Sequence, residues 1–128
     1  MRMNEVKVSS ERTSGKLFLK FEFIGSLKED IALEAISRWE VLMDTQLEEG
    51  EKAEIIWNCE RMTGYESEAR KGWQSMLKES KEKTGDIWIV TAKTMFRVAA
   101  KTMALLTNYK LKAVSSEREI FEKVSIGS

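Results

Sequence analysis

The sequence predicts a single α/β domain covering residues 1–128, with a mixed sheet of about five strands and about four helices. Residues 53–58 and 87–90 are short apolar stretches, each with a tryptophan, typical of strands buried on both faces of a parallel sheet. Helical apolar periods follow both stretches, and two strand-like segments precede them. The chain has 128 residues, the length of one ordinary domain.

An N-terminal hairpin is expected from residues 6–9 and 17–24. Residues 6–9 alternate between apolar and polar, and residues 12–15 have the Arg-Thr-Ser-Gly composition of a turn. The second segment places apolar side chains on one face, and these are Leu17, Leu19, Phe21 and Phe23. Gly25 is expected to end the hairpin.

Three capping boxes, each a Ser or Thr followed three residues later by Glu, predict helix starts. They are residues 26–29, 63–66 and 116–119. The first helix should run to about Leu47, the second should stop at Thr84 and Gly85, and the last should run through about Val124. A helix at 94–107 and a short strand at 111–114 complete the order β-β-α-β-α-β-α-β-α, with parallel central strands.

Catalytic chemistry has few candidate residues in this chain. The sequence has no histidine, which removes the commonest general base and the Ser-His-Asp and Cys-His arrangements. Its single cysteine, Cys59, is expected to be an inert thiol, and one Cys without His does not make a zinc site. There is no glycine-rich phosphate-binding motif. We therefore expect no enzyme activity, no cofactor and no metal.

Charge and hydropathy restrict the partners. Twenty-one basic residues balance twenty-one acidic ones, so no general attraction to nucleic acid is expected. No apolar run approaches the roughly 20 residues of a membrane helix, which predicts that the chain is not an integral membrane protein. A single cysteine and a polar start without a signal-peptide core indicate a reducing compartment, so we expect a cytoplasmic protein.

The element order and the segment from residue 53 to residue 77 resemble the STAS domain, which is the fold of SpoIIAA-type anti-sigma-factor antagonists. CRAL-TRIO lipid-binding modules have a related α/β sheet. The resemblance covers about residues 16–121. It implies that Glu66 and Ser67 stand for an Asp-Ser motif and Ser67 for a phosphorylated serine. Asn58 stands where the family has a strand aspartate, and Glu68, Ala69 and Arg70 replace its small residues. The alternative is that Glu66 completes a capping box and Ser67 is an exposed first-turn residue.

The helix at 94–107 has an unusually wide apolar surface. One apolar face is formed by Phe96, Ala99, Ala100, Met103 and Leu106. Met95, Val98 and Leu105 widen the apolar arc beyond about 200°, more than the stripe of a surface helix. Such a helix needs a second apolar neighbour besides the sheet. That neighbour is an adjacent helix in ordinary core packing, a dimer mate or protein partner, or a lipid-like ligand.

Two sets of polar residues predict an anion site. Lys93, Arg97 and Lys101 recur every four residues near the start of this helix, where free N–H groups favour a phosphate, a lipid head group, a nucleotide-like anion or an acidic partner. Asn58, Thr91 and Thr94 follow the buried strands, whose carboxyl ends should meet at one rim. The alternatives are a solvated cationic face and simple helix capping.

The leading hypothesis is a non-enzymatic, STAS-like regulatory domain that binds a protein partner or forms a homodimer, with Ser67 as a candidate phosphorylation site. The alternative is a binder of a lipid or other hydrophobic anion through residues 95–106 and the Lys93, Arg97 and Lys101 stripe. The candidate surface for both comprises Asn58, Glu66, Thr91, Lys93, Thr94, Met95, Arg97, Val98, Lys101 and Leu105.

Overall fold

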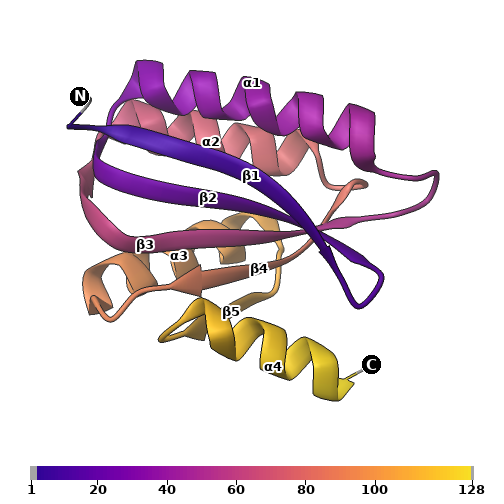
Figure 1. The fold of residues 1–128 in the computed structure, drawn as a ribbon. Helices are drawn as coiled ribbons and strands as arrows, with labels where there is room; N and C mark the ends of the chain where they lie inside the picture. The colour runs from indigo at the N-terminus through magenta and orange to yellow at the C-terminus, as the bar shows by residue number, and fades with distance from the viewer. Residues whose placement is uncertain (1–2, 128) are drawn as a thin grey trace.

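The computed structural model describes residues 3–127 and contains the predicted element order (Figure 1). The strands are β1 Glu5–Thr13, β2 Lys16–Leu27, β3 Ala53–Tyr65, β4 Thr84–Val90 and β5 Leu111–Val114. The helices are α1 Glu29–Gln46, α2 Ser67–Glu79, α3 Thr94–Thr107 and α4 Glu117–Gly127. The predicted α/β class and the β-β-α-β-α-β-α-β-α order are confirmed.

The strands form one sheet in the order β1-β2-β3-β4-β5. The β1–β2 hairpin is antiparallel, and each later pair is parallel. Ile56 of β3 lies opposite Trp88 of β4, so the two apolar stretches run side by side in the same direction, as the sequence predicted. This arrangement puts the carboxyl ends of β2, β3, β4 and β5 at the same edge of the sheet.

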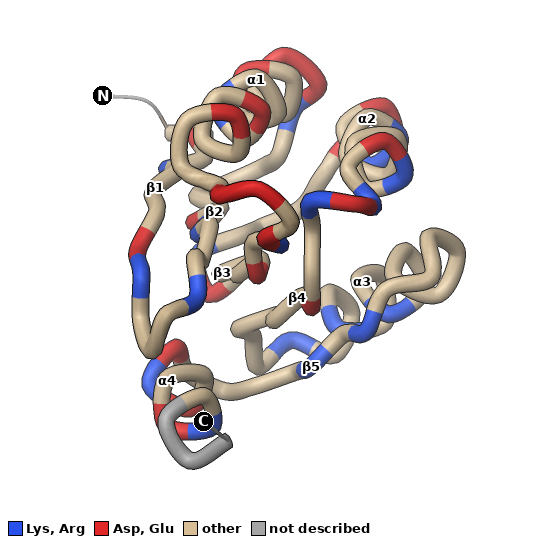
Figure 2. Tube along the Cα trace, turned by 90° about the vertical axis from the view of Figure 1, so that its right-hand side faces the viewer, with Lys and Arg blue, Asp and Glu red and all other residues tan. Residues whose placement is uncertain are grey.

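The helices cover the sheet unequally. α1, α2 and α3 lie on one face, and α4 lies on the other (Figure 2). The first face holds a large core in which Trp73 contacts Phe21, Phe23 and Trp39 edge-on or tilted, with ring centroids 5.1–5.5 Å apart. The core under α4 is smaller and consists of Phe18, Ile56, Trp88, Val90, Val114, Ile120 and Val124. Among the described residues, no helix is both long enough and apolar enough to cross a bilayer.

The predicted end of the hairpin at Gly25 and helix start at Ser26 are wrong. β2 continues through both residues to Leu27, in register with β3 but with a shift between Gly25 and Ser26. Gly25 has φ +75°, and a Cβ on it would lie 2.4 Å from Met3 O and Asn4 Oδ1. Only glycine fits this bulge, so the residue bends the strand and does not end it. The Ser26 N–H donates to Asn4 Oδ1 at 2.9 Å.

The capping box predicted at residues 63–66 is also wrong. β3 extends to Tyr65, and α2 begins at Ser67 with Glu66 at the N-cap and no side-chain cap. The reason is that β2 and β3 extend together, so that the Glu66 N–H donates to Leu27 O at 2.9 Å. The Glu66 carboxylate then accepts the N–H of Glu29 at 2.7 Å, the first residue of α1. Glu66 thus satisfies a free amide of the neighbouring helix.

One further boundary and one capping contact differ from the prediction. α2 ends at Glu79, where the Ser80 hydroxyl donates to Met76 O at 2.7 Å, so Thr84 and Gly85 are not its stop signal but the start of β4. α4 begins at Glu117, as expected, but the Glu119 carboxylate accepts the N–H of Ser115 at 3.4 Å, one residue before the predicted partner.

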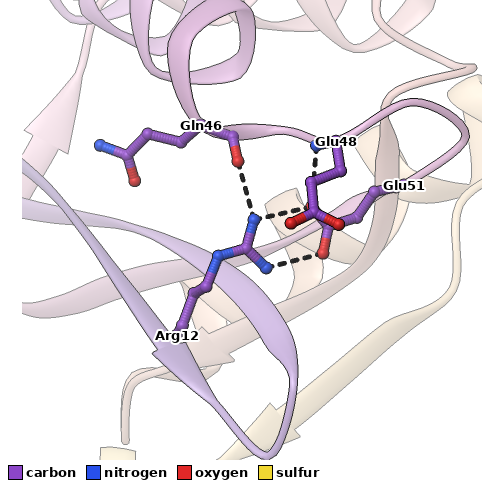
Figure 3. Close-up of polar contacts among 4 residues, drawn as sticks. All are labelled: Arg12, Gln46, Glu48 and Glu51. Atoms are coloured by element: carbon purple, nitrogen blue, oxygen red, sulfur yellow. Dashed lines mark hydrogen bonds and ion pairs between the residues drawn. The ribbon is translucent and has the colours of Figure 1, made fainter.

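A charged clamp holds the tip of the hairpin (Figure 3). The Arg12 guanidinium donates to both carboxylate oxygens of Glu51 at 2.8 Å and to Gln46 O at 2.7 Å. Hydrogen bonds from Arg12 and from the Glu48 N–H hold the pKa of Glu51 at about 2, below its ordinary value of 4.5. The clamp joins β1 to the α1–β3 loop.

Candidate functional site

Helix α3 exposes a row of large apolar side chains. Met95 is 62% exposed, Val98 57%, Leu105 81% and Leu106 60%. Its buried residues are Phe96, Ala100, Ala104 and Thr107, which face the sheet. Leu106, which the sequence groups with Phe96 on one apolar face, is not buried with it, because Ala104 and Thr107 occupy the sheet side of the last turn.

The exposed residues of α3 form one stripe. At about 100° per residue, positions 95, 98, 102, 105 and 106 fall within a sector of roughly 100°. The stripe extends over about 16 Å at roughly 1.5 Å per residue. Thr102 is its one polar member, and Lys101 lies at its border. Four large apolar side chains on one helix face make a contiguous patch, which singly scattered residues do not. We call this surface, Met95, Val98, Thr102, Leu105 and Leu106, the α3 stripe.

The cations predicted to line α3 are held in different ways. Lys93 Nζ donates to Met62 O at 3.0 Å and lies 5.4 Å from the centre of the Phe96 ring. Arg97 Nε donates to Thr91 O at 2.9 Å. Lys101 is exposed. Two of the three cations therefore fix the start of α3 to the ends of β3 and β4, while their charge stays at the rim.

The predicted rim residues do not all meet. Thr91 is buried, and its hydroxyl accepts the Lys93 N–H at 3.1 Å beside the exposed Thr94. Asn58 is buried on the other side of the sheet, where its amide donates to the Glu117 carboxylate and its Oδ1 accepts the Glu60 N–H at 3.1 Å. Asn58 thus anchors α4, away from the α3 side.

Ser67 is the exposed first residue of α2, with an acidic residue on each side. Glu66 contacts the start of α1, as described above. The Glu68 carboxylate pairs with Lys71 at 3.1 Å. Both carboxylates are engaged, and the Ser67 hydroxyl lies at a helix N-terminus, where free N–H groups favour negative charge.

An apolar cavity of about 60 Å³ lies between α2, α3 and the sheet. Tyr65 and Arg70 line it together with residues of the core, and Tyr65 is 37% exposed. Sites for drug-sized ligands usually measure roughly 300–1,000 Å³, so this cavity has room for a side chain or a few atoms, not for a lipid. Tyr65 was not predicted as a site residue, because residues 63–66 were interpreted as a capping box and not as the end of β3.

Cys59 lines the same cavity and is buried. Burial raises the pKa of its thiol to about 12, so the thiolate form is disfavoured at neutral pH. Among the side chains that the structure describes, no group of three or more His, Cys, Asp or Glu could hold a metal ion.

Helix α1 carries a second patch that sequence reasoning missed. Leu33 is 53% exposed and Val41 58%. The buried residues of α1 are Ala32, Ala35, Trp39 and Met43, and Leu33 and Val41 lie outside the face that they form. With Ser37 they follow one another every four residues, and Asp30, Glu40 and Asp44 fall within the same sector of about 100°. We call these six residues the α1 face.

No family model matches the chain, and no curated protein matches it. Solved structures do. An uncharacterised protein of the DUF3478 family from Shewanella loihica PV-4, described as having a SpoIIAA-like fold, matches with a TM-score of 0.79 at 12% identity, over 97% of both chains. The anti-sigma factor antagonist SpoIIAA in its unphosphorylated form matches with a TM-score of 0.65 at 13% identity, over 95% of this chain and 100% of that one. The predicted resemblance is confirmed at the level of the fold: this chain has the SpoIIAA-like fold of the STAS domain.

Proposed function

We propose that this chain is a non-enzymatic regulatory domain that binds a protein partner. The binding surface comprises the α3 stripe and the exposed start of α2 at Ser67. The observation that carries the proposal is the α3 stripe, because its four large apolar side chains face solvent on a helix that already packs by its other face. A patch of this kind on a soluble fold is typical of a protein interface.

The chemistry of the surface supports a protein partner. Methionine and leucine side chains adapt to different apolar contacts, and Lys101 borders the stripe with a mobile charge. Tyr65, Arg70 and the small cavity lie beside α3 and offer a recess for one anchoring side chain. One structural neighbour is an anti-sigma factor antagonist.

Ser67 is the proposed switch within this surface. A phosphate on its hydroxyl would lie at the N-terminus of α2, which stabilises negative charge, and beside Glu66 and Glu68, which oppose it. Because Glu66 accepts a hydrogen bond from α1 and Glu68 pairs with Lys71, their repulsion is partly offset. Phosphorylation would then change the charge of the surface without unfolding the helix.

The test is affinity capture from the native host followed by reconstitution with the purified partner. Leu105→Glu should abolish binding, while Ser75→Glu, on an exposed position of α2, should keep it. Ser67→Asp should change the affinity. Native mass spectrometry of freshly purified protein provides the contrary outcome: a retained lipid, together with equal partner binding by wild type and Leu105→Glu, would favour the lipid hypothesis.

A further inference from the structure

The charges of this chain are segregated between two helices on the same side of the sheet. Residues 87–116, which include α3 and β5, carry five basic residues and no acidic one. Helix α1 carries five acidic residues and one arginine. In Figure 2, α3 and β5 show only basic positions, whereas α1 is predominantly acidic. The chain as a whole has no net charge, so this separation is not visible in its composition.

Both helices combine their charge with exposed apolar side chains. The α3 stripe contains four of them, and Lys101 borders it. The α1 face contains Leu33 and Val41, flanked by Asp30, Glu40 and Asp44. Asp44 pairs with Lys83 at 3.5 Å, but both side chains are more than half exposed, so water screens this pair and a better partner can replace it.

The two surfaces fit each other in pattern. Leu33, Ser37 and Val41 are spaced by four residues, and Val98, Thr102 and Leu106 are also spaced by four. Rows of residues four apart form the ridges that interdigitate when two helices pack. Each row is apolar at its two ends and has a small hydroxyl residue in its centre. The two rows can therefore interdigitate, and the acidic residues beside the α1 row then face Lys101 at the border of the α3 row.

We infer that the partner of the α3 stripe includes a second copy of this chain, which offers its α1 face. This inference rests on the proposed function, since it uses the same α3 surface. The two surfaces of one contact differ, so the contact is head-to-tail, and a bound pair leaves one free α3 stripe on one copy and one free α1 face on the other. Such a contact closes into a ring or continues into a filament, and does not stop at a dimer.

The contact should be weak and sensitive to salt. Its charges lie at the surface, where ions screen them within about 8–10 Å at physiological ionic strength. A net charge of zero means that approaching copies have no overall repulsion to overcome. Assembly should therefore grow with protein concentration at low salt and decline at high salt.

Sedimentation velocity tests the inference with two variants and their mixture. Leu105→Glu places an acidic group in the α3 stripe, and Val41→Lys places a basic group in the α1 face. Each should weaken self-association roughly tenfold or more, because each sets like charges against each other across the contact. Mixed in equal amounts, they should associate again, since the first variant retains its α1 face and the second its α3 stripe. Ser75→Glu is the control for an added charge on an exposed helix.

Three outcomes would overturn the inference. Wild-type protein would remain monomeric at low salt up to its solubility limit. Alternatively, wild-type protein would form a dimer and nothing larger, and Val41→Lys would leave this dimer intact. That result would indicate a contact between two α3 stripes. Finally, the two variants would fail to complement each other although circular dichroism shows both folded. If wild type stays monomeric and Leu105→Glu still abolishes binding of another partner, the inference fails and the proposed function stands.

Discussion

Helices α2 and α3 lie next to each other on the same face of the sheet, yet the surfaces that they expose to solvent differ in polarity. The exposed residues of α2 are all polar, and they are Ser67, Glu68, Lys71, Ser75, Lys78 and Glu79. Those of α3 include Met95, Val98, Leu105 and Leu106. Both helices bury their other side in one core, through Trp73 of α2 and Phe96 of α3. Folding requires the buried sides alone, so the apolar outer side of α3 needs an explanation outside the fold.

The inner sides should be equally intolerant of change, and Trp73 gives the largest expected effect. Trp73 is 2% exposed and lies against four other aromatic rings. Trp73→Ala should lower the free energy of unfolding by about 3–5 kcal/mol, because it removes a large buried side chain and leaves a cavity. Urea unfolding followed by circular dichroism measures this. A loss below roughly 1 kcal/mol would mean that the α2 side of the core is not packed as described.

The last turn of α3 should depend on a cation from the end of α2. Lys81 Nζ donates to Thr107 O at 2.9 Å and to Asn108 O, and lies 3.9 Å from the centre of the Tyr109 ring. A cation at a helix C-terminus stabilises the unpaired carbonyls there. Lys81→Met should therefore cost about 1 kcal/mol of stability.

Hydrogen exchange would localise this effect. In Lys81→Met, the amides of the last turn of α3 should exchange faster, while those of the first turn, held by Arg97 and Thr91, should be unchanged. Lys78→Met, at an exposed position on α2, is the matched control. Equal exchange in both variants would contradict the assigned role of Lys81.

The sequence predicted the sheet better than the surface. Residues 53–58 and 87–90 are buried throughout. In a strand that is buried on both faces, the prediction does not depend on deciding which side chains point toward the core. The capping boxes at residues 26 and 63 failed because the parallel β2–β3 pair extends beyond the end of β4, and that pairing joins residues nearly 40 positions apart. The wide apolar arc of α3 was recognised, but Leu106 was grouped with Phe96 on one face, whereas the fold buries Phe96 and exposes Leu106. A wide arc contains two acceptable faces, and only the packing of α3 on the sheet selects one of them.

The outer side of α3 should contribute little to stability. Leu105 is 81% exposed, so Leu105→Ser removes few contacts and should change the free energy of unfolding by less than about 0.5 kcal/mol. The same change at Leu77, which is fully buried on α2, should cost several-fold more. Chemical denaturation of both variants measures the contrast. A large loss for Leu105→Ser would show that the stripe serves the fold, and the functional argument from α3 would fail.

The smallest expected effect is an acid-dependent one, and it lies away from both helices. Arg12 holds the pKa of Glu51 at about 2, below 4.5, so the ionised carboxylate contributes stability above pH 4.5 that is lost as the pH falls through about 2. In Arg12→Gln the pKa of Glu51 should rise toward 4.5, and the stability difference between wild type and variant should shrink over that pH range. Carboxyl carbon shifts measured by NMR report the titration. Since the clamp joins β1 to the α1–β3 loop, the amide signals of α2 and α3 should not follow it. If these signals do follow the titration of Glu51, low pH also alters α2 and α3. The polar surface of α2 and the apolar surface of α3 could then not be compared at low pH independently of the clamp.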